Sequence, residues 1–389
     1  MTVLLYLGLA MCAGLLMTRL TRLVHLPNVT AYLIAGVLIG PCVLHLLSKD
    51  TVSSLGLITS VALGFIAFSI GDQFRLEDMK KLGTTVLVVT LFESVGAVIL
   101  VDIVTLVCGF PPAECLVLGA LAGSTAPAAT LLVVRQYKAS GPLTSVLLPV
   151  VAADDATGLI AYSISISIAQ GIANGEAFSV VNTLLVPLLE IILALAIGAG
   201  LGFLVALSHR WFHSHTNRMS ICIAAVFCAV AIADHFGLSS LLMCMMLGAV
   251  YVNLRSDAER ILNSVDDWTY PLFMLFFVIS GAQLDLFSLP KVGLLGVIYI
   301  ITRFSGKWLG SWLGATIRKC PKVVKDGIGW ALMPQAGVAI GMATLAVTQL
   351  PQYGSQILTV ILSATLVYEI VGPIATKTAL QKAGEIHTN

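Results

Sequence analysis

Two adjacent carboxylates, Asp154 and Asp155, lie in the middle of an apolar run that extends from Leu143 to Ile168. The run is long enough to cross a bilayer, which takes about 20 residues of helix. A charged side chain at the centre of a membrane costs several kcal/mol, and two adjacent carboxylates also repel each other. Such a pair is expected to persist only where its charge is used, so it predicts a site for a cation or a proton.

The composition of the whole chain is that of a membrane protein. Of its 389 residues, 58% are apolar and 11% are charged, and the mean hydropathy is +0.98. Soluble domains carry about 25% charged residues. Thirteen apolar stretches near the spanning length can be delimited: residues 2–23, 29–47, 51–72, 82–108, 113–135, 142–171, 180–208, 217–234, 237–253, 268–283, 290–317, 325–349 and 356–380. They predict an all-α polytopic membrane protein with about 13 transmembrane helices.

The basic residues indicate the orientation, because loops on the cytoplasmic side of a membrane are rich in lysine and arginine. Of the 21 lysines and arginines, Arg303 and Lys307 lie inside the eleventh stretch, and only Lys49 and Lys291 fall in loops that would face outward. All the others fall in the alternate loops or in the C-terminal tail. We therefore predict a multi-pass protein of the plasma membrane with its N-terminus outside and its C-terminus in the cytoplasm.

Other partners find no support in the sequence. The net charge of +1 gives no argument for binding nucleic acid. The eight cysteines are scattered, without a CxxC pair and without a histidine at metal-ligand spacing. We expect them to be small packing residues rather than metal ligands or disulfides. No cofactor and no enzymatic activity are predicted.

Two of the apolar stretches contain a proline among small and polar residues near mid-span. Pro127 follows Ser124-Thr-Ala in the fifth stretch, and Pro334 precedes Gln335 and Ala336 in the twelfth. Proline removes a backbone donor and drives the preceding residue away from helical geometry. Since the two stretches would cross the membrane in opposite directions, the breaks would be related by inversion, a pattern that points to the substrate site of a transporter. Two ordinary proline kinks are the alternative.

Lys307 is predicted to pair with a carboxylate of the Asp154–Asp155 pair. Asp155 lies 13 residues into its stretch and Lys307 lies 10 residues from the end of its own, both counted from the cytoplasmic side. At about 1.5 Å per residue the two depths agree within roughly 5 Å. A buried ammonium and a buried carboxylate reduce each other's desolvation cost. In the alternative, Lys307 extends to the membrane interface.

Together these segments carry a family resemblance. They are Val150-Val-Ala-Ala-Asp-Asp-Ala-Thr-Gly-Leu159, Ser124-Thr-Ala-Pro127, Gly306-Lys-Trp-Leu-Gly310, Met333-Pro-Gln-Ala-Gly-Val-Ala-Ile-Gly341 and Tyr368-Glu-Ile-Val-Gly-Pro373. In this order the chain resembles, over essentially its whole length, the bacterial sodium/proton antiporters of the monovalent cation:proton antiporter family with paired aspartates.

The resemblance implies inverted repeats with crossed broken helices and an elevator-type division of the chain. Residues 1–72 and 216–284 would form the dimerisation domain of a homodimer, residues 78–175 and 285–389 the moving core, and residues 176–215 a connector.

The resemblance also implies the roles of the site residues. Asp155 would bind Na⁺ and protons in turn, with Asp154 and Thr125 contributing to the Na⁺ site and Lys307 as the charge partner of Asp154. Ser124, Pro127, Pro334, Gln335 and Glu369 would support the site. Many members of the family have Arg-Gly where this chain has Gln335 and Ala336, so the resemblance implies nothing for this chain about pH regulation or about preference for Na⁺ over K⁺. Li⁺ and K⁺ remain alternatives to Na⁺.

The function predicted is exchange of a monovalent cation, with Na⁺ favoured, for protons, with net movement of charge. A sodium-coupled symporter of an organic anion and an ion channel are the alternatives. A channel would favour a continuous polar lining, and a symporter would need a larger polar pocket.

Several other acids remain without a firm role. Glu93 lies mid-way along the fourth stretch, and Glu190 lies in the connector. Asp234, Asp266 and Asp267 are expected at helix ends.

Overall fold

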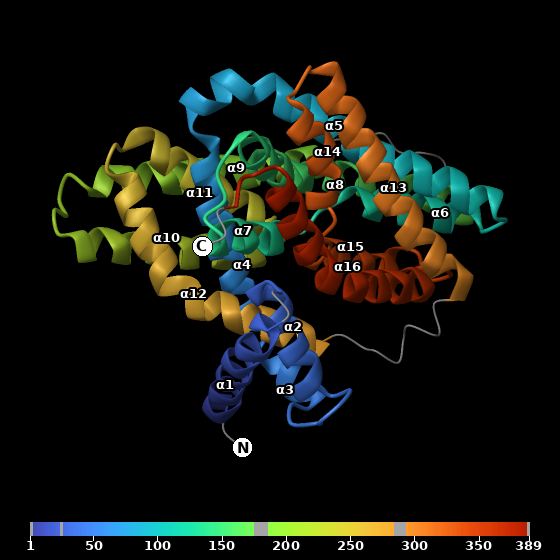
Figure 1. Ribbon diagram of the computed structural model, residues 1–389, viewed down its shortest axis with the longest axis horizontal. Helices are drawn as coiled ribbons and strands as arrows, with labels where there is room; N and C mark the ends of the chain where they lie inside the picture. Colours follow the sequence, from blue (N-terminus) through green and yellow to red (C-terminus); the bar gives the residue numbers. More distant parts are fainter. Residues whose placement is uncertain (1–2, 24–25, 175–185, 284–292, 387–389) are drawn as a thin grey trace. The chain divides into compact units, whose positions relative to one another are not determined.

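The structure, a computed structural model, describes residues 3–23, 26–174, 186–283 and 293–386, and every regular element in these ranges is a helix (Figure 1). Lys291, which entered the orientation argument, lies outside the described residues. The all-α fold predicted from the apolar stretches is confirmed for the described chain.

The helices fall into two compact units. The first comprises residues 1–24, 31–83 and 189–283, and the second residues 25–30, 84–188 and 284–389. The first unit holds α1 (Val3–Arg22), most of α2 (Asn28–Ile39), α3 (Lys49–Ser54), α4 (Gly56–Ile70), the short 3₁₀ helix η1 (Gly71–Phe74), α9 (Val186–Ser208), α10 (His215–Phe236), α11 (Ser240–Leu254) and α12 (Ala258–Gln283). Most of α9, predicted as a separate connector, is thus grouped with this unit. Roles in dimerisation or movement stay predictions.

The second unit holds the segments that carry the predicted site. It contains most of α5 (Leu76–Val107), α6 (Pro112–Gly123), α7 (Pro127–Gln136), α8 (Pro142–Asn174), α13 (Gly293–Ile317), α14 (Lys322–Ala331), α15 (Gly337–Gln349) and α16 (Gly354–Lys382). α6 packs on α8, and α15 lies along α16 (Figure 1).

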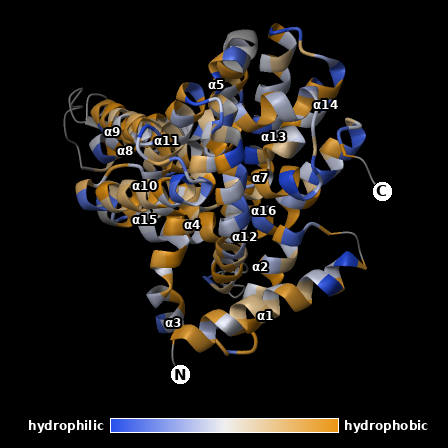
Figure 2. Cartoon of the chain, turned by 90° about the vertical axis from the view of Figure 1, so that its left-hand side faces the viewer, coloured by the Kyte–Doolittle hydropathy of each residue, from blue (hydrophilic) through white to orange (hydrophobic). Residues whose placement is uncertain are grey.

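Seven stretches of the described chain are long and apolar enough to cross a membrane: Val3–Arg22, Gly83–Val107, Pro112–Gln136, Pro142–Ala173, Leu188–Ser208, His215–Phe236 and Gly354–Lys382. Hydrophobic residues cover much of these helices (Figure 2). Large apolar side chains such as Leu4, Leu16 and Leu87 are exposed, as expected for helices that face lipid. The total of thirteen spans stays a prediction.

Helix boundaries differ from the prediction where charge and hydropathy gave conflicting signals. Asp266 and Asp267 were expected at the start of a helix, but α12 begins at Ala258 and both aspartates lie inside it. The first turns of α12 bury Ala258, Ile261, Leu262 and Val265 on one side. Because this amphipathic segment has a low average hydropathy, a spanning-length criterion misses it. Asp234 lies near the end of α10, as expected.

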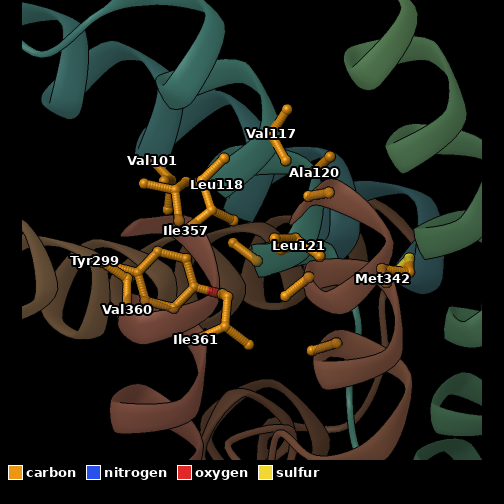
Figure 3. Packing of buried hydrophobic residues seen from close by; sticks show 14 of the residues in the cluster. Val101, Val117, Leu118, Ala120, Leu121, Tyr299, Met342, Ile357, Val360 and Ile361 are labelled. Carbon is orange, nitrogen blue, oxygen red and sulfur yellow. The ribbon is translucent and has the colours of Figure 1, made fainter. Parts of the chain in front are cut away.

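The core of the second unit is a continuous apolar cluster drawn from α5, α6, α8, α13, α15 and α16. Within it, the ring of Tyr299 lies beside Val360 and Ile361, with Leu118 and Leu121 of α6 close by (Figure 3). This packing fixes the end of α6, where the chain leaves helical geometry.

Candidate functional site

Both predicted helix breaks are present in the structure. α6 ends at Gly123 and α7 begins at Pro127, while α14 ends at Ala331 and α15 begins at Gly337. Pro127 occupies the first turn of α7, where the missing N–H costs nothing. The residue before it, Ala126, is extended, as a following proline requires. The breaks are therefore a local consequence of sequence.

The two breaks are in direct contact. The backbone N–H of Ala126 donates a hydrogen bond to the carbonyl oxygen of Pro334 at 2.9 Å. On the other side of Pro334, Gly372 of α16 packs so closely that an added Cβ would lie 2.8 Å from the proline ring. The second unit thus brings the unwound parts of both interrupted helices to one place, with α16 against them.

Arg303 of α13 links the breaks through their free carbonyl groups. Its side chain is fully buried and donates to the carbonyl oxygens of Ser124 at 2.8 Å and Met333 at 2.9 Å, with a longer bond of 3.4 Å to Pro334. The guanidinium also stacks over the ring of Tyr368, 4.4 Å from its centre. Helix breaks leave carbonyls without partners, and one planar cation satisfies acceptors of both breaks here.

Gln335 makes a second link between the breaks. Its Nε2 atom donates to the carbonyl oxygen of Leu121 at 2.9 Å and to the hydroxyl of Tyr299 at 2.8 Å. The side chain is fully buried. Gln335 therefore joins the break before α15 to the last turn of α6 without adding a charge.

The centre of the site is the ammonium group of Lys307, also on α13. Its Nζ atom lies 2.9 Å from Oδ2 of Asp154 and 2.7 Å from Oε2 of Glu93. It also donates to the carbonyl oxygen of Gly123 at 2.5 Å and to the hydroxyl of Thr125 at 2.9 Å. The sequence predicted that Lys307 pairs with a carboxylate of the Asp154–Asp155 pair, and the described contact is with Asp154.

Close helix packing brings Glu93 to this centre. At Gly310 of α13 an added Cβ would lie 2.2 Å from the carbonyl oxygen of Phe92 in α5, and at Gly306 it would lie 2.7 Å from the Cα atom of Ala97. Only glycine allows the two backbones to approach so closely. Because these glycines flank Lys307 in the sequence, the approach places Glu93 against its ammonium group.

Asp154 is held from several sides. Thr125, in the break after α6, donates its hydroxyl to Oδ2 of Asp154, and Thr157 donates to Oδ1 at 3.3 Å. Asp155 follows within α8, and the structure does not describe its side chain. Asp155 is therefore the next residue in α8 after Asp154, a member of the Lys307 cluster.

The charges of the described cluster do not cancel. Glu93 and Asp154 are fully buried, and Lys307 is 1% exposed. With both carboxylates ionised, two negative charges meet one positive charge, and an unpaired buried charge is costly. A proton or a metal cation nearby would restore the balance. This chemistry suits a site that exchanges one for the other.

The other predicted residues lie around this centre in supporting positions. The Ser124 hydroxyl donates to its own helix at the carbonyl oxygen of Leu121, 3.2 Å away. Glu369 of α16 is buried, and its Oε1 atom has no hydrogen-bond partner among the described residues. Glu190, on α9, is exposed. None of these three contacts Lys307 through a hydrogen bond or ion pair described in the structure.

Glu93 and Arg303 take part in the site, but no role was predicted for either of them from the sequence. For Arg303 a signal was present, since it precedes Lys307 by four residues and so lies on the same face of its helix. For Glu93 the signal was weaker: it is an acid at mid-span, and the sequence identified no partner for it. Its relation to Lys307 depends on the glycine contact between α5 and α13, which no local pattern reveals.

Comparison with known proteins places the chain among transporters. Residues 7–382 match the sequence profile of the family described as "Sodium/hydrogen exchanger, transmembrane". No curated protein sequence matches significantly.

Two structures of the sodium proton antiporter MjNhaP1 from Methanocaldococcus jannaschii have a similar fold. One, determined at pH 8, is 17% identical, covers 98% of this chain and 95% of its own, and has a TM-score of 0.70. The other, an electron-microscopy structure, is also 17% identical, covers 97% and 94%, and has a TM-score of 0.76.

Proposed function

Since the chain belongs to the sodium/hydrogen exchanger family and exchanges a monovalent cation for protons, we propose that Asp155 is the group for which cation and proton compete. Asp154 and Thr125 contribute oxygen atoms to the same site, and Na⁺ is the cation. The observation that carries the proposal is the buried cluster of Lys307, Asp154 and Glu93 at the contact between two broken helices, next to Asp155 in the sequence.

In this mechanism the breaks supply oxygen ligands and the acids supply charge. The free carbonyl groups of an unwound segment suit a hard cation such as Na⁺, as do carboxylates. When Na⁺ occupies the site it neutralises Asp155, and when Na⁺ leaves a proton takes its place. Because Asp155 cannot hold Na⁺ and a proton together, binding of Na⁺ on one side of the membrane releases the proton there, and binding of a proton on the other side releases Na⁺.

Lys307 sets the charge moved in each cycle. If its ammonium group gives up a proton as Na⁺ binds, two protons move per Na⁺ and transport carries one net charge. Such a cycle responds to the membrane potential by about 2.3 kcal/mol per 100 mV. Glu369, Gln335, Ser124, Pro127 and Pro334 maintain the geometry of the breaks in this scheme.

The wider setting follows from the resemblance of the chain to its family. We place the protein in the plasma membrane with its N-terminus outside, working as a homodimer in which residues 78–175 and 285–389 move as an elevator against the rest. The distribution of lysine and arginine between alternate loops supports this orientation.

Asp155→Asn tests the central assignment. The variant keeps the size of the side chain and removes its charge, so we expect it to insert and fold but to show no cation-dependent proton movement. Proteoliposomes with an internal pH dye, titrated with Na⁺, Li⁺ and K⁺ at a clamped potential, provide the measurement. Asp234→Asn, at an exposed position near the end of α10, is the matched control and should transport normally. Normal exchange by Asp155→Asn would refute the assignment.

A further inference from the structure

A cavity of about 660 Å³ lies in the second unit, away from the Lys307 cluster, between α13, α14 and α16. Its volume is within the ~300–1,000 Å³ range of small-molecule sites. The lining is mostly apolar and includes Trp308 of α13, Trp330 of α14, and Val371 and Ile374 of α16. Trp330 is 45% exposed and Val371 is 39% exposed, so the cavity opens at the surface of the chain.

The cavity is as deep as one leaflet of a bilayer. Along α14 its lining extends from Lys322, the first residue of the helix, to Met333 in the break, and along α16 it extends from Lys382, the last residue, back to Val371. At about 1.5 Å per residue both walls are roughly 16 Å long. Half of the hydrocarbon core of a bilayer is about 15 Å.

The charged residues lie at one end of this depth. Lys322 and Lys382 line the mouth where α14 begins and α16 ends, and Asp326 is the one acid in the lining. Neither lysine has an ion-pair partner within the described part of the chain. The mouth therefore has a net positive charge, and the apolar walls continue from it toward mid-membrane. Basic pockets of this kind between membrane helices bind anionic lipid head groups.

We propose that this cavity binds an anionic phospholipid, with its phosphate between Lys322 and Lys382 and an acyl chain along the wall formed by Trp330 and Val371. The far end of the chain then reaches Met333, whose carbonyl oxygen accepts the hydrogen bond from Arg303. A bound lipid would brace the end of α14 at its break. The site is separate from the ion-binding role given to Asp155, and lipid binding can be measured without transport.

The test compares lipid retention by variants that alter the mouth or the depth of the cavity. The purified full-length protein is incubated with phosphatidylglycerol or phosphatidylcholine in detergent, and bound lipid is counted by native mass spectrometry. Lys322→Gln combined with Lys382→Gln removes the charge at the mouth. Val371→Trp fills the apolar part from an exposed position and leaves the charge. Lys325→Gln is the control, a lysine of α14 that does not line the cavity. Size-exclusion chromatography with light scattering checks that each variant is folded and gives its oligomeric state.

We expect wild type and Lys325→Gln to retain phosphatidylglycerol in preference to phosphatidylcholine. Both the double lysine variant and Val371→Trp should lose retention of phosphatidylglycerol at least tenfold. Equal retention by all variants would overturn the proposal, and so would an equal loss in Lys325→Gln, which would mean surface attraction only. If Val371→Trp retains phosphatidylglycerol while the double lysine variant loses it, the acyl chain does not occupy the cavity, and the proposal is refuted. A change of oligomeric state in Val371→Trp without loss of lipid would assign the surface to a second copy of the chain instead.

Discussion

Replacing Lys307 should destabilise the protein more than replacing either of its acidic partners. Glu93 and Asp154 are fully buried, and Lys307→Gln leaves both carboxylates beside a neutral side chain, without their positive partner. Removing one partner of a buried ion pair costs about 3–5 kcal/mol. Asp154→Asn instead leaves the ammonium 2.7 Å from Glu93, so the loss should be nearer the ~1–3 kcal/mol of one buried hydrogen-bonding group left without its partner.

The double variant separates interaction from independent losses. Asp154→Asn with Lys307→Gln leaves one buried acid, Glu93, which can take up a proton and become neutral. We therefore expect the double variant to lose less stability than the sum of the single variants, by about 1–3 kcal/mol, the range found for residues in contact. The same comparison between Glu93→Gln and Lys307→Gln should give a coupling of similar size, because the two Nζ–oxygen distances, 2.7 and 2.9 Å, are nearly equal.

Unfolding of the purified variants in detergent, followed by tryptophan fluorescence, gives the measurement. Lys319→Gln, at an exposed position, controls for loss of one positive charge and should leave the unfolding midpoint within error of the wild type. Additive losses in the double variant would mean that Lys307 and Asp154 do not interact in the folded protein. A midpoint for Lys307→Gln no lower than that for Asp154→Asn would refute the shared position of the ammonium between two acids.

Three further predictions concern charge movement, the breaks and pH. A preset Na⁺ gradient should generate a membrane potential in proteoliposomes, and exchange that runs identically at every clamped voltage would exclude net charge transport. Arg303→Gln leaves carbonyl groups of the breaks without a donor and should lower stability by at least about 2 kcal/mol. Arg303→Lys keeps the charge but not the planar fork, so it should recover only part of that stability. A wild-type unfolding midpoint for Arg303→Lys would contradict the role of Arg303 as a planar donor to both breaks. Burial lowers the pKa of His209, although Asp257, 3.6 Å away, opposes the shift. As the pH falls, the unfolded chain therefore binds this proton before the folded protein does, and stability should fall as the pH drops below about 6.5. In unfolding midpoints measured across pH, His209→Gln should remove this part of the decline, and His213→Gln, at an exposed position, should not.

The residues whose behaviour is set by their neighbours in the chain could be predicted from the sequence. Pro127 and Pro334 end helices through their own ring and through the residue before them, and both breaks are where the sequence placed them. Lys307 could be matched to the Asp154–Asp155 pair because depth in a membrane is a one-dimensional coordinate that residue counts give directly. The choice of Asp154 within the pair came from the family resemblance.

The partners that the sequence did not give depend on contacts between distant segments. Glu93 reaches Lys307 because α5 and α13 approach at Gly306 and Gly310, and which helices approach each other is not encoded in depth. Arg303 serves carbonyl groups of Ser124 and Met333, and carbonyl groups are common to all residues. In α12 the hydropathy average concealed an amphipathic start that only its packing reveals.

The second acid beside Lys307 changes how cation binding at the site can work. An ammonium group has three N–H donors, and that of Lys307 is surrounded by four acceptors, from Glu93, Gly123, Thr125 and Asp154. Before it gives up its proton, it can therefore release Asp154 and keep Glu93 and Gly123 as partners, so that no unpaired buried ammonium forms on the way. A pair made of Lys307 and Asp154 alone would have to break, at the full cost of an isolated buried charge, each time a cation drew on Asp154. With Glu93 in place, Lys307 can give up Asp154 to the competing cation at a smaller cost. Glu93→Gln should therefore weaken the apparent Na⁺ affinity, even though Glu93 is not proposed to touch the cation.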